Sequence, residues 1–491
     1  MSRSGRIRGG TAIVAALAAV TCAGSCRGKD PGTSVSPSGT LRVGTGQASL
    51  TADPRLGFRQ INTILSVEGL ARGGEDGRMQ PSLAEGWTVG NDGRSLRVKL
   101  RPNATFHDGS PVDSSIADAI VPKALSALMG PVFADIDHVQ ASDPRTIEIA
   151  FRESSPLLIE ALDASIQKPN GVATGAYAAA ASGTDMAANE HYYLGPPTIR
   201  SVHVENYPSV RTAWAEMLRG NIDMLYEVSP DALSSMQNSS TVSVFTFTRV
   251  YQFVIVLNPD APALRSRDVR RALNMGVDRE AIVGNALNGY GVASSGPVWP
   301  RYWAVNPDAP KFGFDPAAAS KLLGHTLKVT CLVPPDAPFE RIALEVKRQL
   351  ATAGVELILE EVSYDELSRR AGTRQYEALL TELLSGPTLF RPYLVWHSKA
   401  TYNYGQFGTP RIDAALDRVR HAPSDDTYRQ AVAGLQQTFM DDPPAIFLAW
   451  SQRARAVSKK FVVPTPEPGR EILSNLRLWK PAVDAPQASR H

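Results

Sequence analysis

LKVTCLVPPDAPFERIALEVKRQLATAGVELILEEV, residues 327–362, changes its hydrophobic period twice. In Leu327–Val333 every second side chain is apolar, which predicts a strand. Residues 339–353 carry their apolar side chains on one helical stripe, and Gly354 suits the end of that helix. Residues 355–362 predict a second strand. A strand, a helix and a strand of these lengths predict a parallel crossover, and therefore an α/β fold.

The flanking sequence supports this reading. Asp315 before Pro316 predicts the start of another helix, and Asp278 suits the N-cap of one more. The first half of the chain is richer in turns and in short alternating runs. Ser95–Leu100 and Thr146–Phe151 both alternate apolar and polar side chains, which predicts half-exposed strands.

The N-terminus has the pattern of an export signal. Basic residues precede an apolar run at 11–21 that is too short to span a bilayer, and Ala23-Gly24-Ser25-Cys26 resembles the lipid-attachment box of bacterial lipoproteins. We expect residues 1–25 to be a signal peptide, lipidation at Cys26, and a flexible tether over residues 26–39; the alternative is ordinary cleavage with an unmodified Cys26. We expect no other stretch to span a membrane.

Composition excludes some classes of function. The chain has 491 residues, long enough for two or three lobes, with 43% hydrophobic and 20% charged residues, as in a soluble globular protein. Lys plus Arg number 51 and Asp plus Glu number 49, so the charge gives no case for nucleic acid. Of the three cysteines, only Cys331 lies beyond residue 26, and its place in a predicted strand indicates core packing.

Signals for catalysis are weak. His107-Asp108 precedes a glycine and predicts a turn rather than a metal or acid–base pair, and Gly44-Thr45-Gly46 predicts a bend rather than a dinucleotide fingerprint. The sequence contains no G-x-S-x-G and no H-E-x-x-H. We therefore expect a protein that is not an enzyme, with no catalytic residue, no cofactor and no metal site.

An ordered set of segments carries a family resemblance. The first group comprises VEGL (67–70), DG (76–77), PSLAEGW (81–87), DG (92–93) and LRPNATFHDGSP (100–111); the second comprises ATGAY (173–177), residues 189–197, LRGNID (218–223), VRRAL (269–273), VDRE (277–280), FDP (314–316) and LL (322–323). Over about residues 40–460 the chain resembles the family 5 extracellular solute-binding proteins, the oligopeptide, dipeptide and nickel binders.

The resemblance implies an α/β fold of two lobes joined by hinge strands, like a periplasmic binding protein, with the solute enclosed between the lobes. The first lobe is expected to be discontinuous. Lobe I is predicted as residues 40–248 plus the return at residues 454–482, and lobe II as residues 249–453. A disordered tail is expected at residues 483–491.

The resemblance also implies where a solute binds. Lobe I is expected to contribute the residues after its first strand, and lobe II the end of the strand near Glu382. The predicted ligand-binding residues are Gln47, Ala48, Ser49, Tyr251, Gln252, Glu382, Leu383, Ser385, Trp396 and Tyr404. Core packing is an equally open role for the aromatic residues Trp396, Tyr402, Tyr404 and Trp450.

One departure from the family bears on the solute. Peptide-binding members carry an aspartate near the end of this strand that pairs with the peptide ammonium, whereas the present stretch reads ELLSGPT (382–388). A buried ammonium without a counter-charge is costly, so either Glu382 replaces the aspartate or the solute has no free amine. Residues 112–172 also look shorter than is common in the family, which predicts a trimmed subdomain and a more open cleft.

The function implied is that of a monomeric, exported, lipid-anchored solute-binding protein at the outer face of the cell membrane or in the periplasm. It would capture a peptide or peptide-like solute and deliver it to the permease subunits of an ABC importer. The alternatives are a sensor or regulatory lipoprotein that retains the fold without transport, and a secreted hydrolase, for which the sequence offers no nucleophile–base pair.

Overall fold

A computed structural model of the chain describes residues 39–46, 55–228, 230–400, 402–403, 408–465 and 470–482. These residues belong to one unit by their contacts. The predicted signal peptide, the tether up to residue 38, Cys26 and the predicted tail lie outside the described residues.

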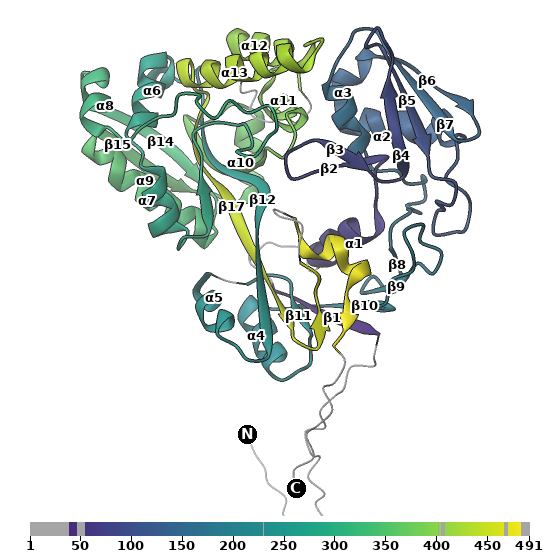
Figure 1. Cartoon of the computed structure of the whole chain (residues 1–491). Coiled ribbons are helices and arrows are strands. Elements are labelled where there is room, and N and C mark those ends of the chain that lie inside the picture. Colours follow the sequence, from purple (N-terminus) through teal and green to yellow (C-terminus); the bar gives the residue numbers. More distant parts are fainter. Residues whose placement is uncertain are drawn as a thin grey trace, which may run out of the picture. The chain divides into compact units, whose positions relative to one another are not determined.

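The largest sheet in the described part of the chain is mixed and has eleven strands (Figure 1). Its order is β15-β14-β16-β12-β17-β11-β1-β10-β9-β8, and β13 pairs with β17. The strands are β1 (Thr40–Gly46), β8 (Tyr177–Ala179), β9 (Asp185–Ala188), β10 (Ser201–Tyr207), β11 (Met224–Leu225), β12 (Val242–Leu257), β13 (Gly291–Ala293), β14 (Leu327–Val333), β15 (Val355–Glu361), β16 (Ala378–Leu384) and β17 (Ala445–Ser458).

Two long antiparallel strands, β12 and β17, connect the two ends of this sheet; we call them the long ribbon. Residues 242–248 of β12 pair with residues 452–458, and residues 252–256 pair with residues 445–450. The register shifts between Thr248 and Gln252. On one side of the shift β17 pairs with β11, and on the other β12 pairs with β16. The predicted lobe boundaries at residues 248 and 453 fall beside this shift, although the division itself stays a prediction.

The α/β half follows the sequence pattern. β14 and β15 are parallel neighbours joined by α9 (Ala337–Thr352), which begins two residues before the predicted start. Asp315 caps α8 (Pro316–Leu323) by accepting from the Ala318 N–H. Asp278 caps α7 (Arg279–Ala281) by accepting from the Ala281 N–H. Cys331 is fully buried in this core, as expected. The remaining elements are η3 (Pro262–Leu264), α6 (Arg267–Met275), η4 (Ile282–Ala286) and α10 (Tyr364–Gly372).

Residues 71–163 form a second, four-stranded sheet of order β4-β5-β7-β6 with its own helices, here called the four-stranded subdomain. β5 and β7 have the predicted bounds. Its elements are β2 (Ala71–Gly73), β3 (Met79–Pro81), β4 (Ala84–Val89), β5 (Ser95–Leu100), α2 (Ile116–Met129), η1 (Gly130–Asp135), β6 (Ile136–Asp143), β7 (Thr146–Phe151), α3 (Leu157–Glu160) and η2 (Ala161–Asp163).

The core of the four-stranded subdomain continues into three helices of the predicted lobe II. Buried side chains of β5 and β7 belong to the same hydrophobic cluster as those of α11 (Phe390–Trp396), α12 (Pro410–Arg420) and α13 (Asp425–Asp441). Sequence periodicity gave no sign of this junction, because it joins segments that are far apart in the chain.

The core of the predicted lobe I lies at the other end of the long ribbon, around α1 (Leu56–Ser66), α4 (Val210–Leu218), α5 (Pro230–Gln237), β18 (Phe461–Val462), η5 (Ile472–Leu478) and β19 (Lys480–Pro481). The bend predicted at Gly44-Thr45-Gly46 is wrong, because these residues are the end of β1 and pair with β10. A Cβ at Gly44 would lie 2.3 Å from the Ile222 side chain, so the glycine permits close packing rather than a turn.

Within the described ranges, the helical segment Ile116–Asp135 is long and apolar enough to cross a membrane by length and composition, contrary to the expectation that no such stretch would follow the signal. It comprises α2 and η1. One face of α2 packs in the core of the four-stranded subdomain through Val121, Leu125 and Met129.

Candidate functional site

The structure brings five of the predicted ligand-binding residues together where β12, β16 and β17 meet. Tyr251 and Gln252 of β12 pair with residues 384 and 383 of β16, so Gln252 lies opposite Leu383. Phe253 lies opposite Glu382. Just beyond β16, the Ser385 N–H donates to the carbonyl of Val250, within the register shift of the long ribbon.

The other predicted residues lie elsewhere. Gln47, Ala48, Ser49 and Tyr404 are outside the described residues. Trp396 is fully buried in the lobe II core, with its ring centroid 5.9 Å from that of Phe439 and 5.4 Å from that of Phe447.

Glu382 has a cationic partner within the chain. Both of its carboxylate oxygens accept from Nη1 of Arg249 at 2.9 Å, and the two side chains are only 16% and 23% exposed. The Arg249 guanidinium also lies 4.2 Å from the centroid of the Tyr251 ring. An ion pair that is this well shielded from water holds both side chains in place. The negative charge of Glu382 is therefore already paired with Arg249 without a solute.

Arg249 was missed by sequence reasoning, but the sequence contains a signal for it. It is the only charged residue in the sixteen residues of β12. A lone charge in a long apolar strand needs a partner or water. Which acid it meets depends on the pairing of β12 with β16, which the sequence alone does not define.

A second side of the site is aromatic. Trp450 of β17 packs edge-on against Trp299, with ring centroids 4.8 Å apart. Gly386 packs closely against both rings. A Cβ at this position would lie 3.1 Å from the Trp299 ring and 3.3 Å from the Trp450 ring. Gln252 is fully buried, and its Nε2 donates to Ser294 Oγ at 2.7 Å and to the Gly296 carbonyl at 2.9 Å.

Several buried polar atoms at this junction have no hydrogen-bond partner among the described residues, and three of them bear on the solute site. They are Gln252 Oε1, Ser385 Oγ and Trp450 Nε1. Gln252 and Trp450 occupy opposed positions on β12 and β17. Buried polar atoms are normally satisfied, so these three are sites where water or a bound molecule would form hydrogen bonds. Together they offer two neutral donors and an acceptor.

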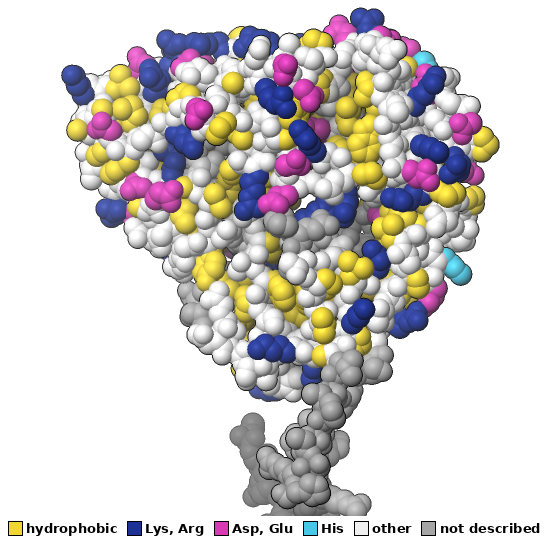
Figure 2. All heavy atoms as spheres, viewed as in Figure 1, with side chains coloured by type: hydrophobic (Ala, Val, Ile, Leu, Met, Phe, Trp, Pro, Cys, Tyr) yellow, Lys and Arg dark blue, Asp and Glu magenta, His cyan; other side chains and the backbone are white. Residues whose placement is uncertain are grey.

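The molecular surface is hollowed near this junction. In Figure 2 a recess near the middle of the pictured face, beside the β2–β3 hairpin of Figure 1, contains Lys and Arg side chains. The C-terminal segment of lobe I reaches the same hairpin, because Nη2 of Arg470 donates to the Gly73 carbonyl at 2.5 Å.

His107 and Asp108 form the turn that the sequence predicted. The Gly109 N–H donates to the Phe106 carbonyl, and Asp108 accepts from Lys168 at 2.6 Å. Burial lowers the pKa of His107, whose Nε2 lies 2.9 Å from the Gly175 carbonyl oxygen. Among the described residues, no group of three or more His, Cys, Asp or Glu side chains is placed to hold a metal ion.

Comparison with known proteins gives a consistent result. A family model described as bacterial extracellular solute-binding proteins, family 5 Middle, matches residues 78–404. The probable D,D-dipeptide-binding periplasmic protein DdpA of Escherichia coli is 23% identical, over 78% of this chain and 81% of its own length. Protein XP55 of Streptomyces lividans is 25% identical, over 91% of this chain and 90% of its own.

Solved structures share the fold. NikZ of Campylobacter jejuni, in complex with Ni(L-His), has a TM-score of 0.76 at 20% identity, covering 90% of this chain and 100% of its own. The oligopeptide-binding protein AppA of Bacillus subtilis, in complex with a nonapeptide, has a TM-score of 0.74 at 19% identity, covering 91% and 100%. Both resemblances show the two-lobe α/β fold.

Proposed function

The chain belongs to the bacterial extracellular solute-binding proteins of family 5, and from this premise we propose that it captures a small solute between its two lobes and delivers it to an ABC permease. Members of this family bind and hand over solutes and are not enzymes. The proposed molecule is a monomer, exported and held at the membrane by a lipid on Cys26.

The observation that carries the proposal is the set of unpartnered atoms at the junction of β12, β16 and β17. Gln252 Oε1, Ser385 Oγ and Trp450 Nε1 are all buried without a partner among the described residues. Leaving a buried polar atom unsatisfied costs about 1–3 kcal/mol each. A solute that supplies the missing partners relieves this penalty, which makes this junction the expected contact point.

In this proposal the two lobes move relative to each other by bending of the long ribbon. Lobe I, at residues 40–248 and 454–482, and lobe II, at residues 249–453, are linked by β12 and β17, whose register shift at residues 248–252 interrupts regular pairing. A solute that contacts both lobes stabilises the closed arrangement by its difference in affinity for the two states.

We further propose that the solute has no free amine at this junction. Glu382 is the acidic residue of the matching stretch, and its charge is already taken by Arg249 at 2.9 Å. The free groups beside it are neutral. A peptide-like solute with a blocked amine, or a neutral polar solute, suits this arrangement better than one with an ammonium group.

The test is native mass spectrometry of the full chain, purified from its own host without denaturant. The expected spectrum contains a species heavier than the polypeptide, whose extra mass is released on denaturation and matches a solute without a primary amine. Incubating the solute-free protein with that solute should restore the heavier species. A chain that carries no solute, and that shows no thermal shift with blocked peptides or neutral sugars, would rule the proposal out.

A further inference from the structure

The four-stranded subdomain is attached to lobe II by polar contacts as well as by the shared core. Trp299 Nε1 donates to the Glu75 carbonyl at 2.9 Å, and the Trp303 N–H donates to the Asp76 carbonyl at 2.9 Å. Both tryptophans lie in lobe II, and both acceptors lie in the β2–β3 hairpin. This interface therefore has to separate, at least in part, when lobe II moves away from residues 71–163.

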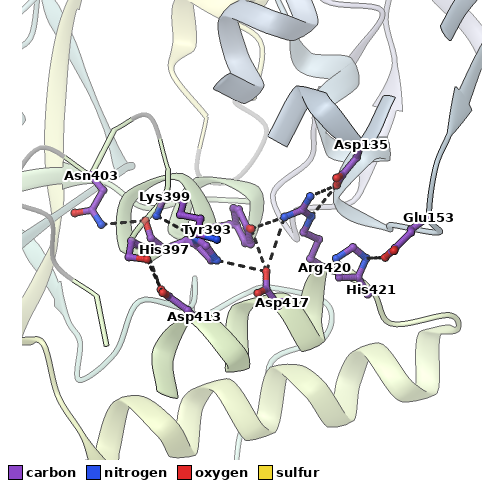
Figure 3. Close-up of polar contacts among 11 residues, drawn as sticks. Asp135, Glu153, Tyr393, His397, Lys399, Asn403, Asp413, Asp417, Arg420 and His421 are labelled. Carbon is purple, nitrogen blue, oxygen red and sulfur yellow. Dashed lines mark hydrogen bonds and ion pairs between the residues drawn. The ribbon is translucent and has the colours of Figure 1, made fainter. Parts of the chain in front are cut away.

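Figure 3 shows the charged edge of the same interface. Arg420 of α12 forms an ion pair with Asp135 of η1, and its Nη1 donates to the hydroxyl of Tyr393 at 2.6 Å. His421, the next residue, lies 3.4 Å from Glu153. The His421–Glu153 contact is open to water, with side chains 33% and 68% exposed, and is weakened by it, whereas the Arg420–Asp135 pair is largely shielded.

The carboxyl group of Glu160, at the end of α3, lies in the buried centre of the interface. Glu160 is 7% exposed. Its Oε1 accepts from the Tyr302 hydroxyl at 2.8 Å, and its Oε2 accepts from the Phe390 N–H at 2.7 Å. The Tyr302 hydroxyl in turn lies 2.7 Å from that of Tyr428 on α13. Every one of these partners belongs to lobe II.

The partners of Glu160 carry no positive charge. The groups that act on its carboxyl are the Tyr302 hydroxyl, the backbone N–H groups of Leu389 and Phe390, and the Thr388 hydroxyl. Arg391, the next charged side chain on α11, lies 3.9 Å from Asp163 instead. Burial raises the pKa of Glu160 to about 7, although these hydrogen bonds oppose the shift. Once the interface opens, water restores the ordinary value near 4.5.

Protonation suits the observed hydrogen bonds. The protonated carboxyl can donate to the Tyr302 oxygen, the Tyr302 hydroxyl can then donate to Tyr428, and the other carboxyl oxygen still accepts from Phe390. The ionised form accepts from the same neutral donors but leaves a buried negative charge. The proton itself comes from water.

We infer that Glu160 is a proton-controlled latch: its protonated carboxyl holds the four-stranded subdomain against lobe II, and loss of the proton loosens this interface and opens the solute site. The inference rests on the proposed function for the opening motion, and it adds the regulation of that motion. The sign follows from linkage. A carboxyl whose pKa is raised in the closed state favours closing at low pH. This advantage is lost as the pH rises from about 4.5 to 7.

The test measures opening directly and needs no solute. Nitroxide labels go on Asn91→Cys, in the exposed turn before β5, and on Asp426→Cys, which is 89% exposed on α13, in a chain with Cys22 and Cys26 changed to alanine. Cys331 is fully buried and stays unlabelled. The distribution of distances between the two labels is measured by double electron–electron resonance at pH 5.5 and pH 8.5.

The closing constant should fall about thirtyfold between these two pH values, seen as a longer and broader distance population at pH 8.5. Glu160→Gln keeps the donor and acceptor pattern of the protonated acid, so it should lose most of this response. Burial also raises the pKa of Asp163, a half-exposed carboxyl beside Arg391, to about 6, and this group should leave a smaller response of the same sign. Glu356→Gln, an acid-to-amide change at an exposed site of β15, should retain the pH response of the parent chain.

The other charged groups of this interface, Asp163 with Arg391, His421 with Glu153 and Arg420 with Asp135, are unchanged in Glu160→Gln. A pH response of the same size in that variant would therefore overturn the latch, as would no response in the parent chain. Circular dichroism and an infrared band for a buried protonated carboxyl at pH 5.5, present in the parent and absent in Glu160→Gln, check folding and assignment. Solute mass spectrometry remains a separate test, so either idea can fail alone.

Discussion

At the residue scale, the pair between Glu382 and Arg249 has a measurable consequence for solute binding. Glu382→Gln removes half of a shielded ion pair and leaves Arg249 without its carboxylate. We expect a loss of about 1–3 kcal/mol in the free energy of unfolding, between the values for exposed and buried pairs. Affinity for the co-purified solute should stay within about threefold, less than 1 kcal/mol.

Isothermal calorimetry and urea unfolding of the same variant separate these two effects. Glu356→Gln, whose carboxylate is 58% exposed and faces Lys328, is the matched control for stability. A hundredfold loss of affinity in Glu382→Gln would show that the carboxylate pairs with an amine on the solute, and the proposed solute class would then be wrong.

Trp396 gives a second residue-scale prediction. Its ring is fully buried between Phe439 and Phe447, so Trp396→Ala leaves a large cavity in the lobe II core. We expect a loss of about 3–5 kcal/mol in the free energy of unfolding. Phe314→Ala removes another aromatic ring, but one that is 46% exposed, and should change stability by about 0.5 kcal/mol or less. Equal losses from the two variants in urea unfolding would contradict the core assignment.

Cys26 lies outside the described residues, and its role rests on the sequence before and after it. Cys26→Ala should move the protein from the membrane fraction to the soluble exported fraction, because it removes the thiol that accepts the lipid. The intact mass should fall by the mass of a diacylglyceryl group beyond the change of side chain. Retention in the membrane with no such mass difference would refute lipidation.

At the scale of the element, α13 depends on its first turn. The Ser424 hydroxyl accepts from the Thr427 N–H, and the Thr427 side chain accepts from the Ser424 N–H, which makes a capping box. Ser424→Ala should cost about 1 kcal/mol of unfolding free energy, and Ser424→Thr should recover most of it. Urea unfolding of the two variants checks this. If alanine and threonine give the same midpoint as serine, the cap contributes nothing to stability.

Elements built from local pattern could be predicted, and those built from distant pairing could not. The alternation in Leu327–Val333 and the stripe that follows it predicted β14, α9 and β15 to within two residues. Gly44 was misread because its reason for being glycine is the Ile222 side chain, which arrives from another part of the chain. The same holds for Arg249 and Glu382, which belong to different strands.

At the scale of the whole molecule, the long ribbon makes the two lobes dependent on each other. β12 and β17 supply strands to both ends of the eleven-stranded sheet, so melting either lobe exposes the edges of the other. We expect one calorimetric transition with equal van't Hoff and calorimetric enthalpies. Two separated transitions, or a stably folded fragment of residues 249–453, would contradict this coupling.

The junction between the four-stranded subdomain and lobe II is the largest feature that the sequence did not reveal. Its residues come from β5, β7 and α3 on one side and from α11 and α13 on the other. Each of these elements has an apolar face that several partners could cover, so periodicity alone predicts burial but not the neighbour. The expectation of a trimmed subdomain with a more open cleft concerned length only and stays a prediction.

The order of synthesis gives the long ribbon one more consequence. The ribosome makes β12 well before its partner β17, and all of lobe II lies between them. Until residues 445–458 emerge, β11 has no strand to join it to lobe II and β12 has one uncovered edge. Contacts of such long sequence separation form last. For a member of a family that works outside the cytoplasm, a sheet that closes only near the end of translation keeps the growing chain in a form that can still be threaded through the membrane.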